Sequence, residues 1–302
     1  MLRVVWRFSD GKAGHDNQSR GLSEALNRLR SVEVVTLAPL SPLQALNGLA
    51  LGRHPPDWSS LPAPDVLLGA GHRTHLSLLA ARRLRGGRVV VLMRPSWPLA
   101  LFDLCLIPEH DAPPVRSYVL ATRGALNRIQ PSARLDDCQG LLLIGGPSTH
   151  FGWDAPSLYR QIAVVLAAAT PLEWTLTTSR RTPPDFLEGL PSPAASRLTV
   201  VPVAHTGPDW LPAQLARAGQ VWVTADSVSM VYEALTAGAA VGVLEMPQRQ
   251  PNRIQCGVER LMAEGWVTAF AQWSPGQVLP RPPAGFNEAE RCARWMVAQW
   301  RA

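Results

Sequence analysis

Short apolar runs that alternate with stretches of helical spacing are the feature that most constrains the fold of this chain. In its first part, runs rich in Val, Leu and Ile end at a glycine or a polar turn, and amphipathic stretches lie between them. The predicted strands there are Leu2–Phe8, Val32–Leu37, Val66–Gly69, Arg88–Met93, Leu104–Pro108 and Tyr118–Ala121, with helices at Gln18–Leu29 and Thr74–Leu84. This alternation is typical of parallel sheets that are covered by helices.

The same alternation restarts after a polar segment, Ile129–Cys138, which contains a proline and paired aspartates and is the predicted linker. The strands predicted beyond it are Leu141–Ile144, Glu173–Thr178, Leu198–Val203, Val221–Thr224, Val241–Glu245 and Trp266–Phe270, with helices at Pro156–Ala168, Ser227–Ala237, Arg253–Glu264 and Asn287–Trp300. A chain of 302 residues is long enough for two separate cores. We therefore expect two Rossmann-like α/β domains facing each other across a cleft. They are residues 1–135 and 136–302, and the final helix, 287–300, could cross back to the first.

Composition narrows the class of protein. With 46% hydrophobic and 17% charged residues the chain is globular, and its apolar runs are too short to span a bilayer. No secretory signal is recognisable, so a cytoplasmic location is expected. The four cysteines are widely spaced, which predicts reduced thiols and no metal site.

The net charge of +6 favours anionic partners, either phosphates or an anionic membrane surface. A GC-rich coding sequence explains the arginine content equally well. The arginines are dispersed and no groove-reading motif is present, so nucleic acid is not an expected partner.

A polar segment, Ser9–Gln18, follows the first predicted strand. Glycines let a backbone turn closely around a ligand, and the first amides of a helix attract anions. Asp10 and His15 are the candidate acid–base groups, and the alternative is an ordinary strand-to-helix turn. Side chains expected on the acceptor side of a site are Lys12, Asn17 and Gln18 here, and His72, Arg73 and Thr74 after the third strand. His72 and His75 alone are weak evidence for a metal.

In the second domain, two segments at strand ends suit an anion. Gly146 and Ser148 lie in a glycine- and hydroxyl-rich turn after the first strand of this domain. Ser179, Arg180 and Arg181 end the next strand, where guanidinium groups could bind the oxygens of a diphosphate. The alternatives are a hinge for the first segment and a solvated surface for the second.

The segment Val223–Ala234 is the most specific of these signals. Asp226 and Ser227 are expected to cap a helix whose first amides bind phosphate, with Ser229 nearby. Glu233, one turn further, could accept hydrogen bonds from ribose hydroxyls. A carboxylate would repel a diphosphate, so the Asp226 side chain should point away or meet Arg180 or Arg181. The alternative is a capped helix with a solvated glutamate.

Taken together, the polar segments resemble the "elongated mitochondria" family of mitochondrial-fission proteins. The resemblance rests on DGKAGHDNQSRGL at 10–22, GAGHRTHL at 69–76, PEHD at 108–111, TRGALNRI at 122–129, GGPSTHFGW at 145–153, TTSRRTP at 177–183 and VTADSVSMVYEA at 223–234. It covers most of the chain and implies a GT-B-like fold. In plants it implies recruitment of a dynamin-related GTPase to the mitochondrial surface. This chain has no recognisable organellar presequence and looks bacterial, so we do not expect that role here.

The helix predicted at 227–237 is also similar to the donor-binding helix of GT-B enzymes such as the peptidoglycan N-acetylglucosaminyltransferase. In those enzymes a glutamate holds the nucleotide ribose. The resemblance implies that Glu233 binds ribose and that Ser227 and Ser229 lie near the diphosphate.

The function expected from these residues is a metal-independent GT-B-type glycosyltransferase. Its substrate would be a nucleotide diphosphate sugar, with no further cofactor. The acceptor could be a lipid-linked envelope sugar at the inner face of the membrane. Two alternatives stay open. One is a non-catalytic adaptor that recruits a partner protein. The other is a GT-B-type nucleotide-sugar epimerase, with His150 and Glu109 as acid–base groups.

Overall fold

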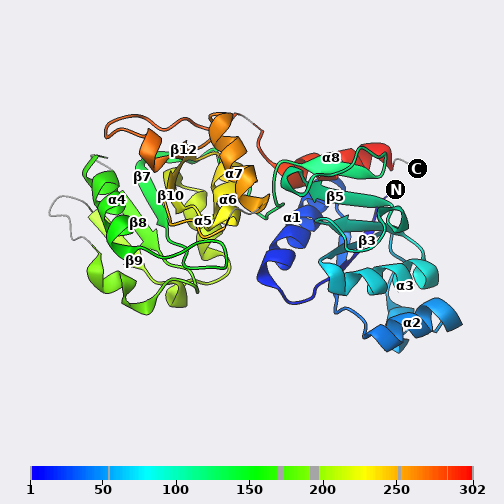
Figure 1. The fold of residues 1–302 in the computed structure, drawn as a ribbon. Helices are drawn as coiled ribbons and strands as arrows, with labels where there is room; N and C mark the ends of the chain where they lie inside the picture. Colours follow the sequence, from blue (N-terminus) through cyan, green and yellow to red (C-terminus); the bar gives the residue numbers. More distant parts are fainter. Residues whose placement is uncertain are drawn as a thin grey trace. The chain divides into compact units, whose positions relative to one another are not determined.

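The computed structural model describes residues 2–53, 55–168, 173–190, 197–250, 253–283 and 285–300. The chain forms two compact units, Met1–Arg128 with Asn287–Ala302, and Ile129–Phe286. Each unit contains a six-stranded sheet (Figure 1). The prediction of two Rossmann-like α/β domains is confirmed. The sequence-based border between residues 135 and 136 lies within the second unit, and residues 287–300 belong to the first.

The first unit has one sheet in the strand order β2-β1-β3-β4-β5-β6, with every pair parallel. Its elements are β1 (Val4–Phe8), α1 (Ala13–Arg30), β2 (Glu33–Leu37), α2 (Pro42–Leu51), β3 (Val66–Ala70), α3 (His75–Arg85), β4 (Arg88–Leu92), β5 (Leu104–Pro108), β6 (Val119–Thr122) and α8 (Glu288–Gln299).

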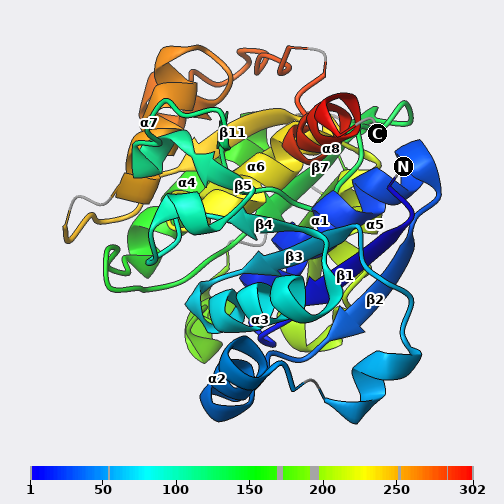
Figure 2. The ribbon, with the colours of Figure 1, turned by 90° about the vertical axis from the view of Figure 1, so that its right-hand side faces the viewer.

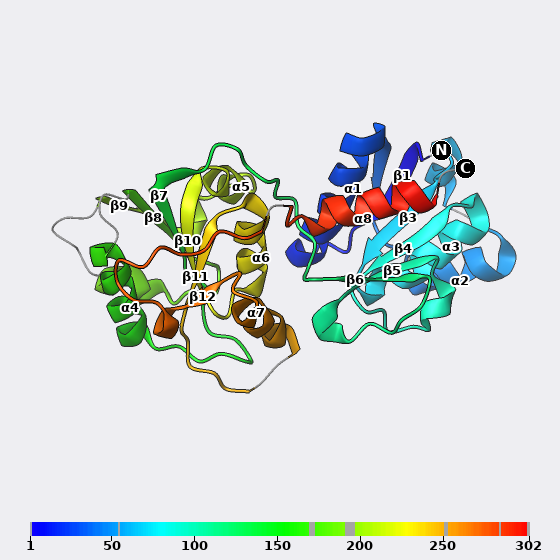
Figure 3. The same cartoon turned by 90° about the horizontal axis from the view of Figure 1, so that it is seen from above.

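Both faces of this sheet are covered, because neighbouring side chains of a strand point to opposite faces. Val5 and Leu68 pack with residues of α1 and α8, which lie along one another on one face (Figure 3). Trp6 and Leu67 pack with residues of α3 on the other face. Strands buried on both faces read as continuous apolar runs, which is why the sequence predicts them.

Helix α2 was not predicted and forms a further layer outside α3 (Figure 2). Ser41 and Gln44 form a reciprocal capping box at its start, Pro42 occupies the first turn, and Gly52 ends the helix at φ 66°. Its side towards α3 is made of small residues, and a Cβ at Gly48 would lie 3.1 Å from Leu84 Cδ1. The packing of α2 therefore depends on close backbone approach.

The second unit has the strand order β12-β11-β10-β7-β8-β9, again with parallel pairs. Its elements are β7 (Asp136–Leu143), α4 (Ala155–Ala168), β8 (Glu173–Thr177), β9 (Arg197–Val201), α5 (Trp210–Leu215), β10 (Ala218–Thr224), α6 (Val228–Ala237), β11 (Ala240–Leu244), α7 (Arg253–Ala263) and β12 (Thr268–Ala269). Helix α4 packs on one face of the sheet, and α5, α6 and α7 pack on the other (Figure 1). Strand β7 begins inside the predicted linker.

Candidate functional site

The polar loops of the second unit meet at the carboxyl ends of its three central strands. Strands β10, β7 and β8 are neighbours in the sheet, so the loops that follow them lie side by side. Gly145 and Gly146 follow β7, Arg181 follows β8, and Asp226 and Ser227 follow β10. Ligands of open parallel sheets bind at this edge.

The Asp226 carboxylate is the centre of this cluster. Its Oδ2 lies 2.6 Å from Arg181 Nη2, and it accepts hydrogen bonds from the Gly146 N–H at 3.1 Å and the Ser227 hydroxyl at 3.2 Å. The Asp226 side chain is 0% exposed, whereas that of Arg181 is 43% exposed. Oδ1 of Asp226 is buried and has no hydrogen-bond partner among the described residues. Three donors therefore converge on one carboxylate oxygen, and its twin is left unsatisfied.

The two glycines are required by close contact. A Cβ on Gly145 would clash with both Asp226 carboxylate oxygens and the Ser227 hydroxyl, and one on Gly146 would clash with the Arg181 carbonyl. The loop after β7 thus approaches its neighbours more closely than any side chain would allow.

Arg181 is held in place from several sides. Its guanidinium also donates to the Gly146 carbonyl at 3.1 Å and to the Ser227 hydroxyl at 3.4 Å. The loop around it is fixed by Thr182, whose hydroxyl donates to Ile144 O at 3.1 Å and accepts from Ser179 N–H at 2.8 Å. Arg180, the other member of the predicted pair, is exposed.

The expectation that Asp226 and Ser227 cap helix α6 is wrong. Ser227 occupies the N-cap position but makes no side-chain cap, and its hydroxyl instead donates to Asp226 and accepts from Arg181. The first amides of α6 are thus left without a side-chain cap, which favours an anion at this end. Ser229 is exposed, whereas Glu233 is buried, which contradicts the alternative of a solvated glutamate.

Ser148 closes a local turn. Its hydroxyl accepts from the N–H groups of His150 at 3.3 Å and Phe151 at 3.1 Å. Nδ1 of His150 is buried and, within the described part of the chain, has no hydrogen-bond partner.

In the first unit, Asp10 and His15 form a pair at the start of α1. His15 Nδ1 lies 3.0 Å from Asp10 Oδ2, and the Asp10 side chain is almost fully buried. Burial raises the pKa of Asp10, but hydrogen bonds from the Lys12 amide and from His15 outweigh it and hold this pKa below its ordinary value. An ionised Asp10 favours the tautomer with the proton on Nδ1 of His15 and leaves Nε2 as a proton acceptor.

The His15 ring lies against the loop after β3. A Cβ on Gly71 would clash with this ring, and the φ of Gly71 is 82°, so glycine is needed there for two reasons. The loops after β1 and β3 are thus in contact, as expected for neighbouring strands.

A second polar network beneath this pair was missed by the sequence analysis. The guanidinium of buried Arg7 lies 2.6 Å from Asp16 Oδ1, which also accepts from the Ser9 hydroxyl at 2.6 Å. Burial raises the pKa of Asp16, but the hydrogen bonds from Ser9 and Arg7 outweigh it and lower this pKa. The network anchors the first turn of α1 to β1. A charged residue inside an apolar strand was the signal for it.

The predicted acceptor-side residues do not share one environment. Lys12, His72 and Arg73 are exposed, and Asn17 is half-buried with its Oδ1 3.4 Å from the Arg128 N–H. Gln18 and Thr74 are buried, and the Thr74 hydroxyl donates to the Gly71 carbonyl at 2.8 Å.

His75 is a buried histidine next to this region. Neither of its ring nitrogens has a hydrogen-bond partner among the described residues, and its ring packs against Phe102 with centroids 5.3 Å apart. Burial, assisted by His72, lowers the pKa of His75 from 6.5 to about 4. His75 therefore stays neutral in the folded protein at neutral pH.

Acid is expected to destabilise the protein through His75. As pH falls from 6.5 towards 4, the unfolded chain binds a proton that the folded state rejects, so stability is full above pH 6.5 and falls within this window. The difference between the pKa of His75 in the unfolded and the folded state corresponds to about 3 kcal/mol of the free energy of unfolding. Urea unfolding across this window should show a smaller loss for His75→Leu than for the wild type. The exposed His205, changed to Gln, is the control; equal losses for the wild type and His75→Leu would contradict the prediction.

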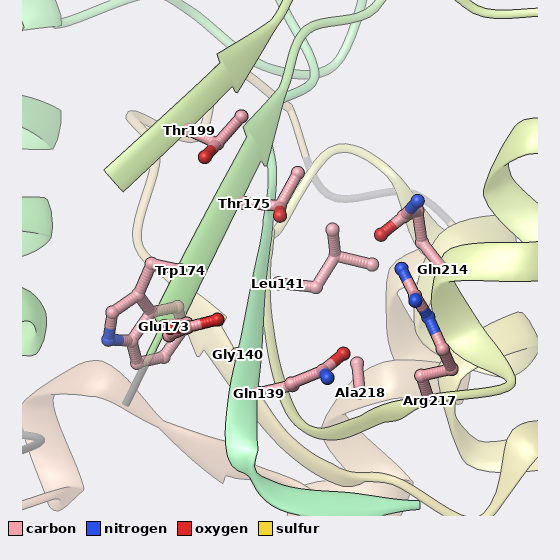
Figure 4. Close-up of a pocket in the computed structure, with 10 residues that line it drawn as sticks. All are labelled: Gln139, Gly140, Leu141, Glu173, Trp174, Thr175, Thr199, Gln214, Arg217 and Ala218. Carbon is pink, nitrogen blue, oxygen red and sulfur yellow. The ribbon is translucent and has the colours of Figure 1, made fainter. Parts of the chain in front are cut away.

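The second unit also contains a pocket of about 360 Å³ (Figure 4). It is lined by Gln139 and Leu141 of β7, Thr175 of β8, and Gln214 and Arg217 at the end of α5. These residues lie towards the amino ends of the strands or at mid-strand, so the pocket is separate from the Asp226 cluster.

The described residues contain no group of three or more His, Cys, Asp or Glu side chains that could hold a metal ion. No helix in the same part of the chain is long and apolar enough to cross a membrane.

Solved structures with a similar fold include two UDP-N-acetylglucosamine 2-epimerases and a glycosyltransferase. A candidate UDP-N-acetylglucosamine 2-epimerase from Listeria monocytogenes matches with a TM-score of 0.54 and 13% identity, covering 86% of this chain and 82% of its own. The UDP-GlcNAc 2-epimerase from Neisseria meningitidis, bound to UDP-GlcNAc, matches with a TM-score of 0.50 and 12% identity, over 99% of this chain and 100% of its own. The glycosyltransferase of kitacinnamycin matches with a TM-score of 0.49 and 14% identity, over 99% of both chains. At these identities the likeness is one of fold, and the expected GT-B-like fold is confirmed.

Sequence comparison identifies the family. Among curated proteins, a search finds no match to this chain. The family model described as Mitochondrial fission ELM1 matches residues 13–300, nearly the whole sequence. The expected resemblance is thereby confirmed, and the chain belongs to the mitochondrial fission ELM1 family.

Proposed function

We propose that the second unit binds a nucleotide diphosphate sugar and that the protein transfers the sugar to a hydroxyl acceptor. The observation that carries this proposal is the partly exposed Arg181 guanidinium, which buried Asp226 holds at the strand ends beside the start of α6, where the first amides have no side-chain cap. Such donors are the ones that proteins use for diphosphates.

Arg181 is the proposed cation for the leaving diphosphate. Its guanidinium is partly exposed, so it can reach a ligand while Asp226 holds it at the strand ends. Arg181 and the α6 amides would stabilise the negative charge that develops as the sugar leaves, which makes the proposed transfer metal-independent. In this proposal Glu233 accepts hydrogen bonds from the ribose, and Ser229, Ser179 and Arg180 lie around the diphosphate. Transfer activity that persists in the presence of a metal chelator would support a metal-independent reaction.

The Asp10–His15 pair is the proposed base. His15 Nε2 takes the proton of the acceptor hydroxyl, whose oxygen forms a bond to the anomeric carbon of the sugar. The bond from that carbon to the diphosphate breaks, and its electron pair leaves with the diphosphate. Asp10 holds Nδ1 of the imidazole at 3.0 Å and stabilises the imidazolium that forms.

An epimerase is the second candidate. It would use the same nucleotide site. His150, on the loop after β7, has a buried Nδ1 with no partner among the described residues, which favours it as an acid–base group. The two reactions are told apart by their products, because an epimerase changes the sugar while it stays attached to the nucleotide.

Thermal unfolding with UDP, GDP, CDP, ADP and their sugars tests the proposal. A ligand at about a hundred times its dissociation constant should add about 2.7 kcal/mol to the stability of the folded state. We expect one nucleotide to raise the melting temperature, and Glu233→Gln to reduce this shift. The matched control is Glu259→Gln, an exposed glutamate on α7, which should leave the shift unchanged.

Each outcome has a clear meaning. A shift that only the Glu233 change reduces identifies the donor and its site. No shift with any nucleotide, in a well-folded sample, would contradict the proposal and favour an adaptor that recruits a protein partner.

A further inference from the structure

Helix α2 exposes large apolar side chains. Leu43 is 70% exposed, Leu46 53% and Leu51 63%. Single exposed leucines are ordinary on a protein surface, but a contiguous set on one short helix marks a contact surface.

The pattern of this helix is the reverse of an ordinary surface helix. Its inner side is formed by Ala45, Gly48 and the partly buried Leu49, whereas Leu43, Leu46 and Leu51 are exposed. Leu43, Leu46 and Ala50 follow the spacing of one helical face, and Leu51 lies beside them. We call these four residues the leucine face.

The helix itself is well formed. It has a reciprocal capping box at Ser41 and Gln44 and a left-handed glycine at its end. The exposed leucines are therefore presented on a defined helix.

The surroundings of the leucine face are basic. The segments 34–56 and 66–102 together carry seven arginines and no acidic residue, and they are flanked by Glu33, Asp57, Asp65 and Asp103. Arg82 is paired with Asp103 at 3.5 Å, whereas Arg53 and Arg83 are exposed. Arg53 directly follows the end of α2, and exposed Arg83 of α3 is next to Leu84, which contacts Gly48. Apolar side chains bordered by arginines match the chemistry of an anionic bilayer surface.

We propose that the leucine face of α2 docks onto an anionic lipid bilayer. Leu43, Leu46 and Leu51 enter the interface, and Arg53 and Arg83 lie near lipid phosphates. At ten residues α2 is too short to span a bilayer and would lie in the plane of its surface. A symmetric pair of copies is disfavoured, because it would bring the same arginines together. Docking needs no nucleotide and does not depend on the proposed transfer reaction.

Co-sedimentation of the full chain with vesicles tests this proposal. Vesicles of phosphatidylcholine and phosphatidylglycerol in equal parts are compared with phosphatidylcholine alone, without nucleotide. We expect the wild type to bind the anionic vesicles and to be released by high salt. The double change Leu43→Gln and Leu46→Gln should lower the bound fraction relative to free protein roughly tenfold, as should Arg53→Gln with Arg83→Gln.

Two aliphatic residues elsewhere give the matched control. Val115 is 94% exposed and Val278 is 87% exposed, and their joint change to Gln should leave binding to vesicles unchanged. Circular dichroism melting verifies that each variant is folded. Binding of the leucine variant equal to that of the wild type would overturn the proposal. So would a wild type that binds neither kind of vesicle, or one whose leucine face holds a dimer by light scattering.

Discussion

Replacing His15 with alanine should lower the turnover of the nucleotide sugar roughly a hundredfold or more, because a positioned general base contributes at least this much. Nucleotide binding should be unchanged, since the Asp226 cluster belongs to the other unit. The Asp10→Asn variant should also turn over the nucleotide sugar slowly. An asparagine carries no charge to hold the imidazole in the required tautomer or to stabilise the imidazolium.

The measurement is steady-state turnover of the donor identified by thermal unfolding, with the nucleotide-induced melting shift recorded for each variant. His205→Ala, at an exposed histidine, should match the wild type. A His15→Ala protein that turns over at the wild-type rate would remove the base from the mechanism. Loss of the melting shift would instead show that the change disturbs binding.

Replacing Arg181 with glutamine should have the largest effect on stability. Asp226 is fully buried, so the change leaves a carboxylate without its cation, and the expected cost is about 3 kcal/mol. Asp226→Asn should cost less, because the partly exposed Arg181 can reach water. Nucleotide binding should weaken strongly in Arg181→Gln, since the guanidinium is the main cation of the cluster.

A double-mutant cycle, measured by urea unfolding, checks this asymmetry. The combined Arg181→Gln and Asp226→Asn protein should regain most of the lost stability, because no buried charge remains unpaired. It should not regain nucleotide binding. Arg180→Gln, at the exposed neighbour, is expected to change stability by less than about 0.5 kcal/mol. Wild-type stability of Arg181→Gln would show that the ion pair is not the main support of Asp226.

Most strands could be predicted because a strand that is buried on both faces of its sheet has a continuous run of apolar residues. Helix α2 could not. Its large apolar residues lie on the outer side and small residues on the inner side, which is the reverse of the usual amphipathic pattern, and Pro42 and Gly52 at its ends resemble loop residues. Helix α5 is only six residues long, too short to show a helical period. The start of strand β7 could not be predicted either, because its first positions, Asp136–Cys138, are exposed and show no apolar run.

The sequence predicted which residues belong to the candidate site, but not which of them form hydrogen bonds or ion pairs with one another. The sequence showed that Asp226 had to avoid or meet an arginine, and packing selects Arg181 over Arg180. Spacing also suggested a side-chain cap for α6, but the Ser227 hydroxyl makes its hydrogen bonds with Asp226 and Arg181. Asp10 and His15 were separate candidates, and only the turn between β1 and α1 brings them together.

The first unit is completed by a helix from the other end of the chain. Leu22 and Leu26 of α1 pack with Cys292 and Met296 of α8, and Arg28 lies 3.3 Å from Glu290. During synthesis, residues up to Arg128 leave the ribosome well before α8 exists, with the apolar side of α1 still uncovered. The second unit, Ile129–Phe286, is continuous and can fold as soon as it emerges. The part of the protein made first is thus finished last, and until then its α1 surface is open to chaperones and to aggregation.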